Sequence, residues 1–334
     1  MKAIIPVAGM GTRLRPHTHT TPKVLLQVAG KPILGHILEQ LVNIGIDEIT
    51  FIVGYLGELI ENYVKSKFKF KSNFVLQSEM KGLGHAIYLT KDIHWKHKKI
   101  LIILGDTIFK ADLKGLMNKK ESHIAVKEVS DPKNYGIVEL STDGTISRMI
   151  EKPENPLTNL AIVGIYLINN PALLYKCLDR NVREGKTTQG EIQLTDALED
   201  MLLQGEVMHP FMIEGWFDCG KPETLLSTNR YLLHQKHREK EEEYEKRFPN
   251  SLIISPVAIA KNVSIANSII GPNVSIGEGA EIEGSIIMDS IIDQKARVKG
   301  VQLEKSLIGS NAKVEGRFYH LNVGDSSEIN LISE

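Results

Sequence analysis

The sequence has few cysteines, no long apolar run and almost no net charge, and each scarcity excludes a class of protein. Its 334 residues include two cysteines, Cys177 and Cys219, too few for a disulfide scaffold, so we expect both to be reduced and buried. No apolar run approaches the roughly 20 residues that span a bilayer, and the N-terminal apolar stretch is too short for a secretory signal. The net charge of −1 favours neither nucleic acid nor an anionic membrane as a partner. These scarcities predict a cytoplasmic protein with neither partner.

The first third of the chain has the pattern of an α/β domain. Its composition, 42% hydrophobic and 24% charged, is ordinary for a globular protein, and its length suits two domains. Short, continuously apolar segments at residues 4–8, 49–53 and 100–104 alternate with helix-like segments. This alternation predicts a doubly wound, Rossmann-like parallel sheet covered on both faces. Ligands of such sheets bind beyond the carboxyl ends of the strands.

The middle of the chain changes character. Strand-like segments at residues 124–129, 136–140, 145–150 and 160–168 follow one another closely, which predicts a mixed sheet region and a possible sugar-binding lobe. Residues 233–249 are densely charged, as expected of a solvated helical connector. We therefore expect a catalytic domain over residues 1–232 and a charged helical linker over 233–249.

After residue 249 the sequence becomes periodic. Aliphatic residues recur every six positions, most clearly at Ile270, Ile276 and Ile282. One inward aliphatic residue per hexapeptide is the mark of a parallel β-helix. Residues 250–334 have room for roughly four coils, and we expect their aliphatic side chains to be buried in the core of the β-helix.

The segment around residues 3–16 is suited to binding a polyphosphate. An apolar run leads into a loop of small residues, in which the backbone can approach phosphate oxygens. Two better-known phosphate loops do not fit, because the P-loop needs four residues between its glycines and the dinucleotide fingerprint needs a glycine where Leu14 stands. The candidate nucleotide contacts are Ala8, Gly9, Met10, Gly11, Thr12 and Arg13, with Lys23 nearby.

This loop resembles the signature of the sugar-1-phosphate nucleotidyltransferases, or NDP-sugar pyrophosphorylases. The family pattern Ala-Gly-Gly-x-Gly-Thr-Arg-Leu-x-Pro, with a Pro-Lys pair after it, is matched here from Ala8 to Pro16 and at Pro22-Lys23, with one glycine fewer and Met10 in a position that is more often small or polar. The resemblance covers nearly the whole chain. It is greatest to glucose-1-phosphate thymidylyltransferases and uridylyltransferases of the long form, which implies a left-handed β-helix at the C-terminus.

Two aspartates are candidate metal ligands. Asp106 follows an apolar strand in Leu-Gly-Asp-Thr, and Asp218 stands in Gly-Trp-Phe-Asp-Cys-Gly. Taken alone, an aspartate at a strand end is commonly a turn residue. Both match the family's Gly-Asp and Trp-x-Asp-x-Gly motifs, and the resemblance implies that together they bind Mg²⁺, which prefers a few carboxylates plus substrate phosphates.

The resemblance also implies two substrate subsites. Gln77 and Gly82 lie in the segment that reads the nucleobase, and a glutamine offers both a donor and an acceptor to a pyrimidine. The sugar-phosphate site would consist of Gly136, Glu151, Lys152 and Tyr166. Histidines 17, 19 and 85 are expected to have surface or packing roles.

The implied reaction joins a nucleoside triphosphate, dTTP or UTP, to a sugar-1-phosphate and releases pyrophosphate. Arg13 would stabilise the leaving pyrophosphate, Lys23 and Mg²⁺ the α-phosphate, and Lys152 the attacking phosphate. One alternative is a non-catalytic scaffold or regulatory subunit, as among translation initiation exchange-factor subunits; it would not need these charged groups. Another is a bifunctional enzyme whose β-helix is an acyltransferase, for which His320 is the only histidine available in residues 251–334. We expect the β-helix to serve assembly or regulation, in a homo-oligomer.

Overall fold

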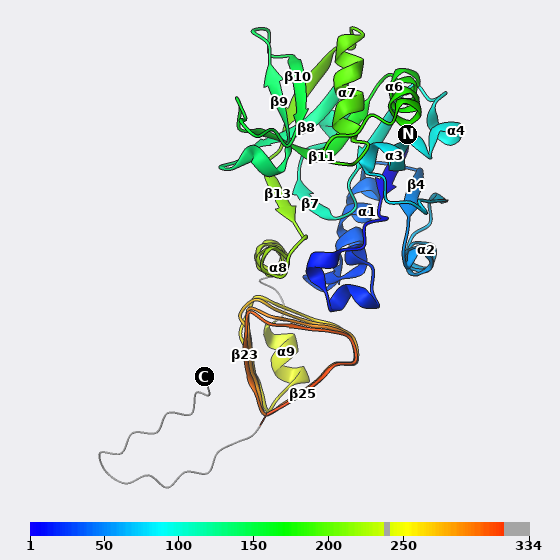
Figure 1. Cartoon of the computed structure of the whole chain (residues 1–334). Helices are drawn as coiled ribbons and strands as arrows, with labels where there is room; N and C mark the ends of the chain where they lie inside the picture. Colours follow the sequence, from blue (N-terminus) through cyan, green and yellow to red (C-terminus); the bar gives the residue numbers. More distant parts are fainter. Residues whose placement is uncertain (237–240, 317–334) are drawn as a thin grey trace. The chain divides into compact units, whose positions relative to one another are not determined.

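The computed structural model describes residues 1–236 and 241–316, and these form two compact units that divide after Thr228 (Figure 1). The predicted boundary after Leu232 lies inside helix α8 (Pro222–Lys236). No helix of the described residues is long and apolar enough to cross a membrane.

The first unit is built on a mixed sheet with the strand order β10-β9-β11-β6-β1-β4-β5, and β8 and β12 extend it through β11. The four adjacent strands β6, β1, β4 and β5 are parallel to one another. Strand β11 is antiparallel to β6, β8 and β9. These strands are β1 (Lys2–Pro6), β4 (Glu48–Val53), β5 (Lys71–Leu76), β6 (Ile100–Ile103), β8 (Ser122–Glu128), β9 (Gly136–Leu140), β10 (Ile146–Glu151), β11 (Leu160–Ile168) and β12 (Met208–Met212). The predicted Rossmann-like mixed sheet is confirmed.

Helices cover this sheet because its central strands have no polar face. All four residues of β6 are fully buried, and a strand buried on both faces must be apolar throughout. The helices are α1 (Ile33–Asn43), α2 (Gly57–Lys67), α3 (Leu83–Tyr88), α4 (Lys91–His94), α5 (Leu113–Met117), α6 (Pro171–Glu184) and α7 (Leu194–Leu203). Two short ribbons complete the unit, β2 (Gln27–Val28) with β3 (Lys31–Pro32) and β7 (Thr107–Lys110) with β13 (Gly215–Asp218).

The second unit contains three parallel stacks of four short strands each, β14-β17-β20-β23, β15-β18-β21-β24 and β16-β19-β22-β25. Register within the stacks places aliphatic residues above one another, as in the row Ile265, Ile282, Val298 and Val314. The predicted hexapeptide β-helix of about four coils is therefore confirmed. The strands are β14 (Leu252–Ile253), β15 (Val257–Ile259), β16 (Ser264–Ala266), β17 (Ile269–Ile270), β18 (Val274–Ile276), β19 (Glu281–Glu283), β20 (Ile286–Met288), β21 (Ile291–Ile292), β22 (Arg297–Lys299), β23 (Gln302–Glu304), β24 (Leu307–Ile308) and β25 (Lys313–Glu315).

Helix α9 (Glu241–Arg247) belongs to the core of the β-helix unit. Tyr244, with Phe248 just after the helix, is buried in one cluster with Val257, Val263 and other inward aliphatic residues of the coils. Figure 1 shows α9 within the triangular outline of the coils. The charged segment that was expected to be a solvated connector therefore buries two aromatic side chains, and it can cover the apolar end that an open solenoid would otherwise expose.

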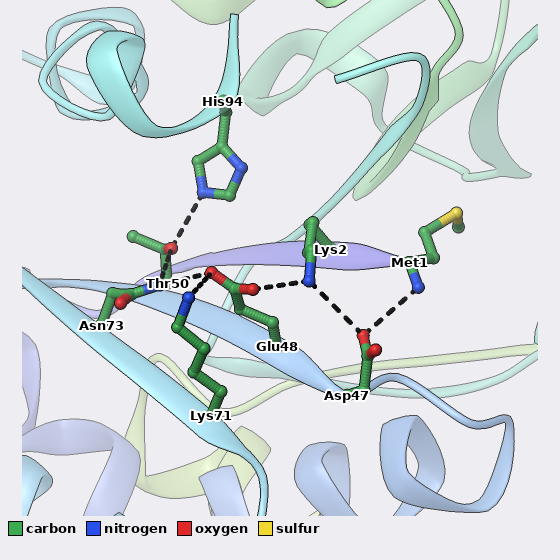
Figure 2. Close-up of polar contacts among 8 residues, drawn as sticks. All are labelled: Met1, Lys2, Asp47, Glu48, Thr50, Lys71, Asn73 and His94. Carbon is green, nitrogen blue, oxygen red and sulfur yellow. Dashed lines mark hydrogen bonds and ion pairs between the residues drawn. The ribbon is translucent and has the colours of Figure 1, made fainter. Parts of the chain in front are cut away.

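An ionic network around the buried Glu48 joins the amino ends of three parallel strands (Figure 2). Glu48, whose side chain is 9% exposed, starts β4 and lies in register between Lys2 of β1 and Lys71 of β5. Its carboxylate accepts hydrogen bonds from Lys2 Nζ at 2.5 Å and from Asn73 Nδ2 at 3.0 Å, and Lys71 Nζ lies 3.2 Å away. The hydrogen bond from Lys2 is the largest cause that lowers the pKa of Glu48 to about 2.

We expect Glu48→Gln to lower the free energy of unfolding at pH 7 by about 2 to 3 kcal/mol, because the carboxylate is held ionised well below its ordinary pKa. A depressed carboxyl pKa stabilises the fold above the unfolded-state value of 4.5, and this contribution is lost as the pH falls from there towards 2. Urea unfolding of wild type and variant at pH 7 and pH 3 measures the difference. Glu61→Gln, which removes an exposed helical ion pair with Lys65, is the control and should change stability by less than about 0.5 kcal/mol. An equal loss at both pH values would contradict the assignment.

Candidate functional site

A pocket of about 480 Å³ opens beyond the carboxyl ends of the parallel strands of the first unit. Its lining contains residues from both predicted subsites and from the glycine loop: Ala8, Gly9, Lys23, Gln77, Gly82, Asp106 and Lys152. These residues are far apart in the sequence, and each stands just after a strand or in a loop that returns to the sheet edge. The remaining predicted residues do not line this pocket, so their places are described separately.

The glycine loop brings its backbone close to Lys23. Gly11 has φ +62°, and a Cβ on it would lie 2.9 Å from Lys23 Cβ, so a side chain here would push the lysine away. Thr18 Oγ1 donates a hydrogen bond to the Gly11 carbonyl at 2.8 Å and fixes the turn. Met10, Thr12 and Arg13 are exposed. The loop therefore presents a cation, an open backbone at Gly9 and exposed polar side chains on one side of the sheet.

The two aspartates are brought together by the β7–β13 ribbon. Asp218 pairs with Thr107, the neighbour of Asp106, and the Cys219 amide donates to the Asp106 carbonyl at 3.4 Å. Lys23 Nζ lies 2.8 Å from Asp106 Oδ2. Burial is the largest cause that raises the pKa of Asp218, and the charge of Asp106 raises it further, whereas Lys23 and Arg13 lower it. Arg13, Lys23, Asp106 and Asp218 therefore share one electrostatic environment.

This carboxylate pair fits a hard divalent cation. A partly buried carboxylate beside a second one is destabilised in its charged form, and a bound cation relieves both the burial and the repulsion. Among the described residues no group of three or more His, Cys, Asp or Glu side chains is placed to hold a metal. Two carboxylates alone suit Mg²⁺, which completes its coordination with water and substrate phosphate oxygens.

The nucleobase segment is fixed by its own hydrogen bonds. Gln77 is 4% exposed, and its Nε2 donates to the Gly82 carbonyl at 3.2 Å. Gly82 has φ +99°, and a Cβ on it would lie 2.7 Å from the Ile192 carbonyl oxygen. Only glycine is tolerated where the loop meets residues 191–192, so the shape of this end of the pocket depends on that close approach.

The predicted sugar-phosphate residues gather at the end of β10. Thr195 Oγ1 donates to Glu151 Oε2 at 2.6 Å, and a Cβ on Gly136 would lie 2.9 Å from the same oxygen. Lys152 adopts φ +42°, unusual for a residue with a side chain; its amide donates to the Tyr135 carbonyl at 3.1 Å, and its Nζ lies 3.7 Å from Glu151 Oε1. A strained backbone that is fixed in this way is typical of functional positions.

Tyr166, like Gly136 among the predicted sugar contacts, is buried, and only 4% of the residue is exposed. Burial is the main cause that raises the pKa of its hydroxyl, and the charge of Glu151 adds to it. Tyr166 thus lies in the core, near enough to Glu151 for the carboxylate charge to act on its hydroxyl, and it has little surface to offer a sugar.

Sequence reasoning missed two residues at this site, Thr195 and Glu191. Thr195 fixes Glu151, and Glu191 lines the pocket. The one sequence signal that could have indicated Glu191 is the turn-forming pair Gln189-Gly190 directly before it, both with positive φ.

The two cysteines are buried as expected, and burial raises the pKa of Cys219 to about 12, which makes it a poor nucleophile.

Comparison with known proteins identifies the family. The family model described as "Nucleotidyl transferase" matches residues 2–235, and one described as "GlmU-like, C-terminal hexapeptide" matches residues 235–315. The chain belongs to the nucleotidyl transferase family. It joins this domain to a hexapeptide domain of the GlmU-like kind.

Several relatives of this nucleotidyl transferase cover it almost completely. It is 32% identical over 374 residues to the low-salt glycan biosynthesis nucleotidyltransferase Agl11 of Haloferax volcanii, with 99% of this chain and 100% of the relative covered. It is 30% identical over 364 residues to a glucose-1-phosphate thymidylyltransferase of Streptomyces antibioticus, with 100% of each chain covered. A solved structure of UDP-glucose pyrophosphorylase with UDP-glucose matches with a TM-score of 0.61 at 26% identity, covering 70% of this chain and 99% of the other.

Proposed function

We propose that this nucleotidyl transferase forms an NDP-sugar and pyrophosphate from a nucleoside triphosphate, dTTP or UTP, and a sugar-1-phosphate, with glucose-1-phosphate as the expected sugar. One observation carries the proposal: a single pocket is lined by Lys23 and Asp106, by Gln77 and Gly82, and by Lys152. Three chemically distinct groups that suit phosphate, base and sugar phosphate therefore border one space. Thymidylyltransferase relatives support dTTP, and the UDP-glucose complex of a structural neighbour supports UTP.

The chemistry needs positioning and charge neutralisation more than an acid or a base. A phosphate oxygen of the sugar-1-phosphate attacks the α-phosphorus in line, an oxygen–phosphorus bond forms, and the bond to the β-phosphate breaks to release pyrophosphate. The sugar phosphate is already a nucleophile, so no proton must be removed. Lys152 holds the attacking phosphate, Lys23 stabilises the charge on the α-phosphate, and Arg13 stabilises the leaving pyrophosphate.

Asp106 and Asp218 would hold Mg²⁺, which when bound neutralises phosphate charge as a Lewis acid. Lys23 has a second task, because it contacts Asp106 at 2.8 Å and lowers the pKa of Asp218. Its charge therefore opposes the burial that raises the pKa of Asp218 and favours the ionised form of that carboxylate, which binds a cation.

The lysines, the arginine and the aspartates to which we assign these roles argue against a non-catalytic scaffold, because a scaffold needs none of them. For the bifunctional alternative, His320, the candidate base of an acyltransferase, lies outside the described residues. Pyrophosphate release measured over a matrix of nucleoside triphosphates and sugar-1-phosphates tests the proposal. Release with one pyrimidine nucleotide and one sugar-1-phosphate is the expected result. No release with any pair would favour the scaffold.

The β-helix is proposed to serve assembly, because the predicted phosphate and metal groups all precede residue 219 and leave the second unit without one. We expect the full chain, 37.3 kDa, to have a mass in solution that is a multiple of this value. Sedimentation equilibrium measures it directly. A single species of 37.3 kDa across the concentrations tested would contradict the assembly role.

A further inference from the structure

A carboxylate that none of the proposed roles uses lies in the wall of the substrate pocket. Glu191 lines this pocket together with Gly82 and Lys152. Within the described part of the chain, no lysine, arginine or histidine nitrogen forms an ion pair with Glu191, and its side chain receives one long hydrogen bond, 3.4 Å from Gln193 Nε2 to Oε2. An exposed carboxylate with so few partners has acceptor capacity to spare for a ligand.

The backbone of Glu191 is fixed on both sides. Its amide donates to the Thr188 carbonyl at 3.2 Å and its carbonyl accepts from the Thr188 amide at 2.9 Å, which closes a tight turn. The next residue bonds to the nucleobase segment: the Ile192 amide donates to the Lys81 carbonyl at 2.8 Å, and the Gly84 amide donates to the Ile192 carbonyl at 2.8 Å. Glu191 therefore occupies a defined position relative to the loop that would contact the base.

The charge of Glu191 limits what it can contact. Both substrates of the proposed reaction are polyanions, so a carboxylate in their pocket would repel a phosphate and needs a neutral donor instead. A Cβ on Gly82 would lie 2.8 Å from Glu191 Cβ, so the side chain begins beside the base end of the pocket. In a nucleotide the group between base and phosphates is the ribose, whose hydroxyls are neutral donors. Acidic residues hold ribose hydroxyls in the same way in dinucleotide-binding domains.

We propose that Glu191 accepts hydrogen bonds from the ribose hydroxyls of the nucleotide and thereby determines which sugar of the nucleoside is accepted. This inference rests on the proposed function, because it assigns a subsite to the nucleotide of that reaction. It adds a specificity contact between the base-reading segment and the phosphate groups, and it leaves the roles of Lys23, Lys152 and the aspartates unchanged.

The test combines removal of the carboxylate with removal of each hydroxyl. Wild type, Glu191→Ala and Glu191→Gln are assayed for kcat/KM with a ribonucleoside triphosphate and its 2′-deoxy and 3′-deoxy analogues, in the uridine or thymidine series, whichever the wild type uses. We expect Glu191→Ala to lower kcat/KM by about 10- to 100-fold for a nucleotide with the contacted hydroxyl, as for other hydrogen bonds to a charged group. For the analogue without that hydroxyl the loss should be below about 3-fold, because the contact is already missing.

Glu184→Gln is the matched control, since Glu184 is an exposed carboxylate at the end of α6 that does not line this pocket. It should leave kcat/KM for all three nucleotides unchanged. An equal loss for all three nucleotides in Glu191→Ala, or a change confined to the KM of the sugar-1-phosphate, would overturn the proposal. Calorimetric binding of the same nucleotides gives a second readout without turnover. A wild type that binds nucleotides but releases no pyrophosphate would count against the proposed function alone.

Discussion

Asp218→Asn is expected to lower turnover by about 100-fold or more, and Asp106→Asn to do the same. Each substitution removes one of the two carboxylates that we propose to hold Mg²⁺ at the reacting phosphate, and loss of one such electrostatic contribution typically costs this much. We expect the effect of Asp218→Asn to be on turnover and not on stability. The pKa of Asp218 is raised by burial and by the charge of Asp106, so a neutral asparagine relieves a repulsion and should not lower the melting temperature.

The measurement is steady-state pyrophosphate release as a function of Mg²⁺ concentration, with thermal unfolding of the same samples. Asp92→Asn, in an exposed carboxylate on α4, is the control and should match the wild type in both. If either active-site variant keeps near-normal Mg²⁺-dependent turnover, that aspartate is not a metal ligand. If one of these variants loses turnover because it no longer folds, the other aspartate variant tests the proposed metal site.

Patterns that depend on neighbouring residues were sufficient to predict most of the fold. Continuous apolar segments indicated strands buried on both faces, and β6 is fully buried. The six-residue period indicated stacked coils, and Ile265, Ile282 and Val298 are in register above one another. In both cases the same short-range spacing that appears in the sequence determines the packing, so no knowledge of distant contacts was needed.

Features that depend on distant pairings could not be predicted. The segment containing Tyr244 appeared solvated because its composition is charged, and only the coils of the second unit show that its aromatic side chains are buried. Glu48 has no unusual neighbours in the sequence; its low pKa arises from lysines that strand register places on either side of it. A composition average cannot show which face of a helix is buried, nor which residues lie across a sheet.

The candidate site shows the same division. Motif spacing identified Lys23, Asp106 and Lys152, and the structure places all three in one pocket lining. Tyr166 belonged to a separate matched segment, and it lies in β11, a strand that is buried along nearly its whole length; a motif does not tell which residues of such a strand meet the substrate. Glu191 belonged to no motif considered, and it enters the pocket only because its turn bonds to the loop at residues 81–84.

Lys152→Ala is expected to raise the KM for the sugar-1-phosphate by about 30- to 100-fold, with a much smaller change in the KM for the nucleotide. The left-handed backbone at Lys152, with φ +42° and its amide fixed by the Tyr135 carbonyl, directs this residue into the pocket. Its Nζ lies 3.7 Å from Glu151 Oε1, which is too far for a strong hydrogen bond, so the ammonium is available to the phosphate of the sugar-1-phosphate.

Arg13→Ala is the matched comparison for Lys152→Ala, because we expect it to affect the nucleotide and not the sugar-1-phosphate. Arg13 is exposed in the glycine loop, and its charge lowers the pKa of Asp218, so it lies near the aspartates that would hold Mg²⁺. Its loss should impair use of the nucleotide and the reverse reaction with pyrophosphate, while the KM for the sugar-1-phosphate changes little. Initial-rate measurements in both directions, varying one substrate at a time, separate the two variants. If Lys152→Ala instead weakened only nucleotide binding, the positions of the sugar and nucleotide subsites in this pocket would have to be exchanged.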